Sequence, residues 1–183
     1  MAGTEISYID EYGNILEDIP DSSEGVTSID ELEGDYAALL KEIDLSSINE
    51  ELTVDYYEEG EGSANLDLLI DNDVNRILTM EVIVGLGNYY STMEEFSEEF
   101  ISGIQSQYEE IDVEMIDFDE DEFILLISTL AEPGEYDAYI ELLRVFNKDG
   151  DIFSITYKDM YKEEMDKEIV NIENFLNINI FPP

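Results

Sequence analysis

The chain has 183 residues, of which 48 are acidic and 7 are basic, and its formal net charge at pH 7 is −41. It contains no Cys and no His, which excludes disulfides, thiol nucleophiles, Ser-His-Asp triads and the usual zinc ligands. No apolar run reaches the length of a membrane span, and residues 1–17 lack the basic and apolar parts of a signal peptide. Apolar residues still make up 44% of the chain, which is enough to build a core.

The negative charge restricts the partners that the protein can meet. Residues 1–75 hold 22 of the acidic residues and residues 76–183 hold the other 26, so the charge is not that of an acidic tail. Such a surface repels nucleic acids and anionic membranes, and it attracts basic proteins and cations. The net charge equals that of the phosphates in roughly 20 base pairs, since duplex DNA carries one charge per ~1.7 Å.

Residues 1–50 are expected to form an acidic N-terminal segment. A hairpin is predicted over residues 6–19, where apolar residues flank the turn-forming Tyr12-Gly13-Asn14. A helix is predicted from Ser28 to about Ile43, because Ser28 and Glu31 have the spacing of a capping box and apolar residues follow at helical spacing.

Residues 51–183 are expected to form a second unit that is richer in strands. Alternating apolar residues predict strands at 52–59, 66–70, 77–86, 113–118, 123–130, 138–146 and 152–158. The third strand should place Leu78, Met80, Val82, Val84 and Leu86 on one face. A tight turn is predicted at 147–150, where Gly150 suits a positive φ.

Two helices are predicted in the same unit. The first runs from Thr92 to about Glu109 and opens with a capping box formed by Ser91 and Glu94. The second runs from Met160 to Leu176. Because short turns between consecutive strands favour antiparallel pairing, the predicted fold class is α+β, an antiparallel sheet packed by amphipathic helices.

This order of elements resembles the PsbP-like sandwich over residues 52–178. The resemblance is carried by the strand Leu78–Leu86, the helix opened by Ser91-Thr92-Met93-Glu94-Glu95-Phe96, the hairpin Phe146–Phe153 and the final helix. The family includes exported lipoproteins, photosystem accessory proteins and secretion chaperones. The resemblance therefore implies a binding protein rather than an enzyme.

The candidate chemistry of the chain is limited. With 48 carboxylates, some pair always has a separation that suits acid–base catalysis, so such pairs carry little information. The stretches 117–121 and 147–151 alternate possible calcium ligands, but neither has the Gly and Glu that an EF-hand loop requires at its sixth and twelfth positions. We therefore predict no enzymatic activity, no metal site and no cofactor.

The acidic residues without basic neighbours are the candidate partner-binding residues. On ordinary helices Glu is interspersed with Lys, and the absence of Lys here indicates that a basic partner supplies the missing charge. The candidates are Glu58, Glu59, Glu61, Glu94, Glu95, Glu98, Glu99, Asp117, Asp119, Glu120, Asp121 and Glu122. The pairs Tyr56-Tyr57 and Tyr89-Tyr90 are further candidate contacts, unless each pair has one ring in the core and one at the rim.

The leading hypothesis is a non-catalytic inhibitor that mimics nucleic acid on a basic nucleic-acid-handling protein, as phage anti-restriction, anti-CRISPR and nuclease-immunity proteins do. It implies a cytoplasmic location in a bacterial host, no direct nucleic-acid binding and no membrane insertion. The alternative is an exported or lipid-anchored PsbP-like accessory protein, whose acidic surface serves solubility and cation binding. A third interpretation is the solvated surface of a halophilic protein.

Overall fold

The computed structural model of the chain describes residues 26–46, 48, 50–107, 110–132, 135 and 138–160. The predicted hairpin at 6–19 and the predicted final helix lie outside these ranges, apart from Met160. The described elements are mainly strands, accompanied by two α-helices and two short 3-10 helices.

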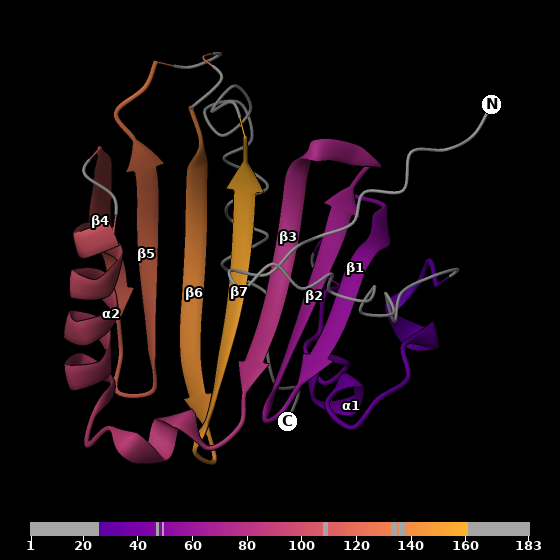
Figure 1. Ribbon diagram of the computed structural model, residues 1–183, viewed down its shortest axis with the longest axis horizontal. Coiled ribbons are helices and arrows are strands. Elements are labelled where there is room, and N and C mark those ends of the chain that lie inside the picture. Colours follow the sequence, from indigo (N-terminus) through magenta and orange to yellow (C-terminus); the bar gives the residue numbers. More distant parts are fainter. Residues whose placement is uncertain are drawn as a thin grey trace, which may run out of the picture.

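Seven strands form one sheet in which every neighbouring pair is antiparallel (Figure 1). Their order across the sheet is β1-β2-β3-β7-β6-β5-β4. The strands are β1 (Leu52–Gly60), β2 (Ser63–Ile70), β3 (Asp73–Ile83), β4 (Ile111–Phe118), β5 (Glu122–Thr129), β6 (Ile140–Lys148) and β7 (Asp151–Asp159). The predicted antiparallel sheet is confirmed, and its two halves join where β3 pairs with β7.

The predicted strands are present with shifted ends. The third strand ends at Ile83 and not at Leu86, because Gly85 adopts a φ of 76° and turns the chain into the 3-10 helix η2 (Leu86–Tyr89). Val84 consequently lies outside the core, with 40% of its surface exposed. The turn between β6 and β7 is as predicted, since Asp149 and Gly150 have φ values of 56° and 93°, as a type I′ hairpin requires.

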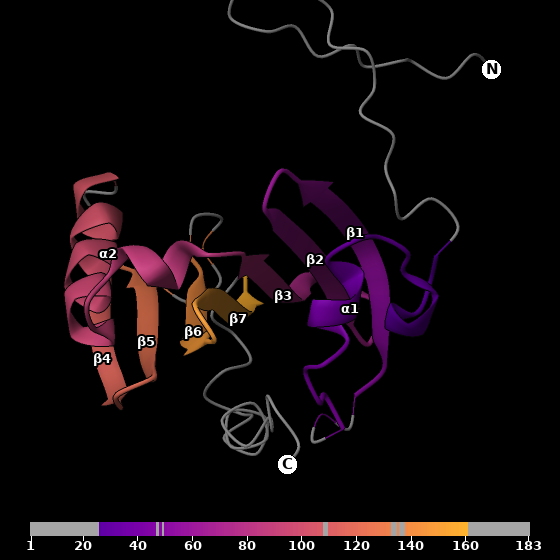
Figure 2. The same ribbon diagram turned by 90° about the horizontal axis from the view of Figure 1, so that it is seen from below.

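Each face of the sheet carries a separate hydrophobic cluster. Alternate residues of β2 and β3, such as Leu66, Leu68, Leu78 and Met80, join β7 residues in the larger cluster, as the period of two along a strand requires. The other face is apolar over β5 and β6, where α2 covers it. Figure 2 shows α1 and α2 on opposite faces, at opposite sides of the sheet.

Helix α2 (Met93–Gln107) agrees with the predicted helix. Its apolar side packs on β5, and the rings of Tyr90, Phe96, Phe100 and Phe123 form a chain with centroids 4.6–5.9 Å apart. The predicted capping box is wrong by one residue.

The observed cap of α2 uses Thr92 and Glu95. The Thr92 Oγ1 accepts from the backbone N–H of Glu95 at 3.2 Å, and the Glu95 Oε2 accepts from the N–H of Ser91 at 2.9 Å. The Thr92 side chain thus satisfies an N–H group that the helix leaves unpaired at its start, and the Glu95 side chain holds the residue that precedes the cap.

The continuous helix predicted over 28–43 is wrong. The chain instead forms the 3-10 helix η1 (Ile29–Glu31) and the one-turn helix α1 (Ala37–Leu40), separated by Gly34. Ser28 does cap η1, since its Oγ accepts from the N–H of Asp30 at 3.4 Å. Residues of this segment, Leu32, Ala37, Leu40 and Ile43 among them, are buried in the larger cluster, so the described part of the N-terminal segment packs on the sheet.

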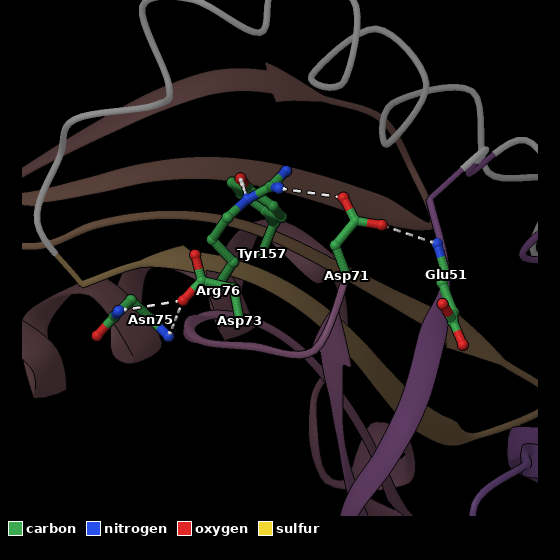
Figure 3. A network of polar contacts seen from close by, with 6 residues as sticks. All are labelled: Glu51, Asp71, Asp73, Asn75, Arg76 and Tyr157. Atoms are coloured by element: carbon green, nitrogen blue, oxygen red, sulfur yellow. Dashed lines mark hydrogen bonds and ion pairs between the residues drawn. The ribbon is translucent and has the colours of Figure 1, made fainter.

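A polar network ties the start of β1 to the turn between β2 and β3 (Figure 3). The Asp71 carboxylate accepts from the N–H of Glu51 at 3.1 Å and lies 3.6 Å from the Arg76 guanidinium. Asp71 and Asn72 have φ values of 54° and 58°, so this turn is also of type I′ although neither residue is glycine.

Candidate interaction surface

The antiparallel order brings three hairpin turns to one end of the sheet. The turns β1–β2, β4–β5 and β6–β7 all lie at the lower end in Figure 1, where α2 also begins. We call this the acidic end, and it comprises the turns at residues 60–63, 118–122 and 148–151 together with the first two turns of α2. The end contains or adjoins every residue predicted to bind a partner, so the fold gathers positions that are distant in sequence.

The α2 side of the acidic end is the most exposed part. Glu94, Glu95, Glu98 and Glu99 are all exposed, because the opposite side of the helix is buried in the smaller cluster. A pocket of about 190 Å³ separates the start of α2 from the β4–β5 turn. Its lining comprises Gly87, Tyr90, Ser91, Thr92, Met93, Phe96, Glu120, Asp121, Asn147 and Ile152.

The β1 side of the acidic end is separate from the α2 side. Glu58, Glu59 and Glu61 lie at the end of β1 and in the following turn. Since β1 and β4 are the opposite edges of a seven-stranded sheet, six strand spacings of ~4.8 Å place the two acidic groups about 29 Å apart. The twelve predicted residues therefore share one end of the molecule but form two patches.

Glu59 binds within the protein and is not available to a partner. Its carboxylate accepts from the backbone N–H groups of Tyr36 at 2.8 Å, Asp35 at 3.0 Å and Ala37 at 3.1 Å, and from the Tyr57 hydroxyl. Burial on its own raises the pKa of Glu59, but these four donors outweigh burial and hold the pKa below its usual value. The prediction that Glu59 contacts a partner has no structural support.

Glu122 is also engaged within the chain. Its Oε2 accepts from Arg144 Nη2 at 2.7 Å and from Nε at 2.9 Å, across the β5–β6 ladder. Glu58 accepts from the Tyr56 hydroxyl at 2.6 Å. By contrast, Asp117, Asp119, Glu120 and Asp121 are exposed.

The described cations are all bound to acceptors of the chain itself. Arg76, Arg144, Lys148 and Lys158 pair with acidic side chains at 2.7–3.6 Å, and Lys41 donates to two backbone carbonyls. Lys148 is the one basic residue among the residues of the three turns, and its Nζ lies 2.7 Å from the Oε2 of Glu42. The exposed carboxylates of the acidic end consequently keep their negative field.

Two further features of the acidic end were not among the predicted acidic residues. Asp149 lies in the β6–β7 turn, between the two patches, and the sequence pattern indicates it only as a possible calcium ligand. Tyr89 is 85% exposed in η2 at the same end, whereas Tyr90 packs on Phe96. One ring of the pair is thus available for contact, which is common for Tyr at interfaces.

Within the described ranges, no three acidic side chains converge as they would to hold a metal ion. In the same part of the chain, no helix combines the length and apolar character needed to cross a bilayer.

The chain matches no protein-family model, and no curated protein matches it. The fold and the surface together define a highly acidic protein built on a seven-stranded antiparallel sheet with few helices.

Proposed function

We propose that this protein is a non-catalytic inhibitor that binds a basic, nucleic-acid-handling protein through the α2 side of the acidic end. The exposed carboxylates of α2 and of the β4–β5 turn take the place of nucleic-acid phosphates in the basic groove of the target. A phage anti-defence inhibitor and an immunity protein of a nuclease toxin are the two biological settings in which this chemistry is useful.

The observation that carries the proposal is that every described Lys and Arg side chain binds an acceptor within the chain itself. A net charge of −41 destabilises a folded chain through self-repulsion, yet no described cation is placed among the carboxylates of α2. A basic groove that accepts these carboxylates relieves the repulsion on binding. Association is then fast and strongly dependent on salt.

The experiment is capture of host proteins by the immobilised chain at about 50 mM and about 500 mM salt, with and without competing duplex DNA or RNA. Mimicry predicts one enriched basic nuclease or nucleic-acid-binding protein that the duplex displaces. Indiscriminate capture of basic proteins, lost entirely at the higher salt, contradicts mimicry.

Two triple variants of equal charge locate the binding surface. The test variant carries Glu94→Gln, Glu98→Gln and Glu99→Gln, and it spares Glu95 because Glu95 caps the helix. The control carries Glu51→Gln, Glu110→Gln and Glu132→Gln at the other end of the sheet, where all three residues are exposed. We expect only the test variant to lose affinity for the captured protein, by at least about tenfold if each carboxylate contributes about 0.5 kcal/mol.

The order of the described elements supports a second proposal. From β1 to β7 the chain has three strands, a helix and four strands, which matches the order that resembles the PsbP-like sandwich except for the final helix, which lies outside the described residues. Under this proposal the protein is an exported or lipid-anchored accessory protein with a cation-binding surface. A signal sequence encoded upstream of residue 1 favours it, and a short phage-like operon favours the inhibitor.

A further inference from the structure

The two edges of the sheet differ in what lies beside them. The β1 edge is partly covered, because the N–H of Val54 donates to the carbonyl of Thr27 at 3.3 Å. On β4, no described backbone group outside the β4–β5 hairpin pairs with the strand. An uncovered edge strand presents a row of N–H and C=O groups to which another extended chain can bind.

The two faces of β4 have opposite chemistry. The register pairs Val113, Met115 and Phe118 with the β5 residues that face α2, so these apolar side chains lie on the α2 face. Asp112, Glu114 and Asp117 alternate with them and lie on the other face. Met115, Ile116 and Phe118 are 38–45% exposed, although large apolar side chains are usually covered.

We propose that β4 binds an extended segment of the basic partner as an eighth strand, in which basic residues alternate with apolar ones. The apolar side chains of that segment extend the cluster beneath α2, and its Lys or Arg side chains face Asp112, Glu114 and Asp117. This inference rests on the proposed function for the positive charge of the partner. It adds that the partner binds by strand addition and that basic and apolar residues alternate in its bound segment.

Charge complementarity selects this occupant over a second copy of the chain. Two antiparallel β4 strands would place the acidic face of one beside the acidic face of the other, and like charges directly opposite in a sheet are destabilising. A basic strand meets no such repulsion.

The position of β4 connects this edge to the acidic end. Asp117 is followed directly by the β4–β5 turn with Asp119, Glu120 and Asp121. A partner segment lying along β4 therefore leads its chain into the pocket region beside α2, and the two contacts belong to one continuous surface.

The test uses a blocked eight-residue peptide of alternating Arg and Val, which matches the length of β4, and the full-length chain. One control peptide has the four Arg before the four Val, and another is N-methylated throughout, so that it keeps its charge but has no N–H to donate. We expect the alternating peptide to bind at least about tenfold more tightly than either control. The N-methylated peptide loses several hydrogen bonds, and the peptide with four Arg before four Val cannot place its Arg and Val side chains on separate faces. Amide hydrogen exchange should slow in residues 112–118 and stay unchanged in β1.

A charge exchange separates strand addition from general attraction. Asp112→Lys with Glu114→Lys should lower the preference for the Arg-Val peptide over an alternating Glu-Val peptide. Glu51→Lys with Glu132→Lys changes the net charge equally at exposed positions outside β4 and α2, and it should lower that preference much less. Equal binding of the N-methylated peptide, or no added protection in β4, overturns the proposal. The β4 amides that do not pair with β5 should exchange freely in the free protein. If they are already protected, the proposal is overturned, by a second copy if the protection rises with protein concentration and by the chain itself if it does not.

Failure of this proposal is distinguishable from failure of the proposed function. If the peptides do not bind but the α2 triple variant still loses the captured protein, the acidic end is the binding surface and β4 is not.

Discussion

The Glu59 carboxylate accepts a hydrogen bond from the backbone N–H of Tyr36 at 2.8 Å, although 23 residues separate the two. An acidic residue of the sheet therefore caps a helix of the N-terminal segment. A Cβ added at Gly34 would lie 2.2–2.5 Å from the same carboxylate, so the glycine allows the close approach. The contact links a buried part of residues 26–46 to β1.

Glu59→Ala should destabilise the protein by about 1–2 kcal/mol, because it removes the acceptor of three N–H groups at the start of α1. Urea unfolding measures the change. Glu58→Ala is the matched control, since Glu58 accepts only the neighbouring Tyr56 hydroxyl among the contacts described, and it should cost less than half as much. Equal losses in the two variants would show that α1 does not depend on Glu59.

The contribution of Glu59 should depend on pH with a defined sign. Its pKa is lowered in the folded protein, so the folded state binds its proton less readily than the unfolded state does. The stabilisation is complete above the ordinary value of 4.5 and is lost as the pH falls through the lowered pKa. The difference in unfolding free energy between wild type and Glu59→Ala should accordingly shrink on acidification, and a constant difference between pH 7 and pH 3 would contradict the capping role.

Glu81 should behave in the opposite way. Burial in the middle of β3 raises the pKa of Glu81 despite its contact with Ser154 at 3.5 Å, so the charged form weakens the fold near neutral pH. Glu81→Gln should stabilise the protein at pH 7 by less than about 1 kcal/mol, because solvent screens a half-buried carboxylate. The gain should disappear as the pH falls below the raised pKa, and Glu98→Gln on the exposed side of α2 is the control.

The ion pairs of Arg144 and Lys148 should contribute different amounts to the free energy of unfolding. Arg144 and Glu122 have side-chain exposures of 14% and 29%, whereas Lys148 and Glu42 have 34% and 49%. Arg144→Met should cost about 1–2 kcal/mol because it leaves Glu122 without its partner, and Lys148→Met should cost at most about 0.5 kcal/mol. In a double-mutant cycle with Glu122→Gln, most of the free energy of unfolding lost in Arg144→Met should appear as coupling energy between the two residues. Absence of coupling would show that this ion pair does not stabilise the fold.

Much of the fold followed from local sequence pattern, and some of the exceptions involve contacts between residues that are distant in sequence. The alternation in β1 to β7, the apolar side of α2 and the Asp149-Gly150 turn all depend on neighbouring residues, and their predictions are confirmed. Beside the break at Gly34, the N–H groups of residues 35–37 donate to Glu59, which is distant in sequence. The pairing of β3 with β7 likewise depends on contacts between the two halves of the sheet.

The candidate surface was predictable in part. Runs of acidic residues identified α2 and the β4–β5 turn, and the antiparallel order explains why they meet at one end. Pairing of Glu122 with Arg144 could not be read from spacing, because it requires the β5–β6 register. The position of β4 at an edge to which no other described strand pairs could be known only from the strand order, which local pattern does not contain.

Salt should stabilise the free protein without a specific ion. Screening of the −41 charge raises the melting temperature by about 2–4 °C for each kcal/mol of repulsion removed. NaCl and KCl should have equal effects at equal ionic strength. A saturable effect of calcium at concentrations too low to screen charge would instead indicate a specific cation site and contradict this prediction.

Displacement of the captured host protein by duplex nucleic acid, at one fixed ionic strength, is the decisive test of nucleic-acid mimicry. Mimicry predicts that the duplex releases the partner from the wild-type chain and that the α2 triple variant captures it more weakly than the charge-matched control does. If the duplex releases nothing, and both triple variants capture the same set of basic proteins equally well, the acidic end is a solvated surface and the protein does not mimic nucleic acid.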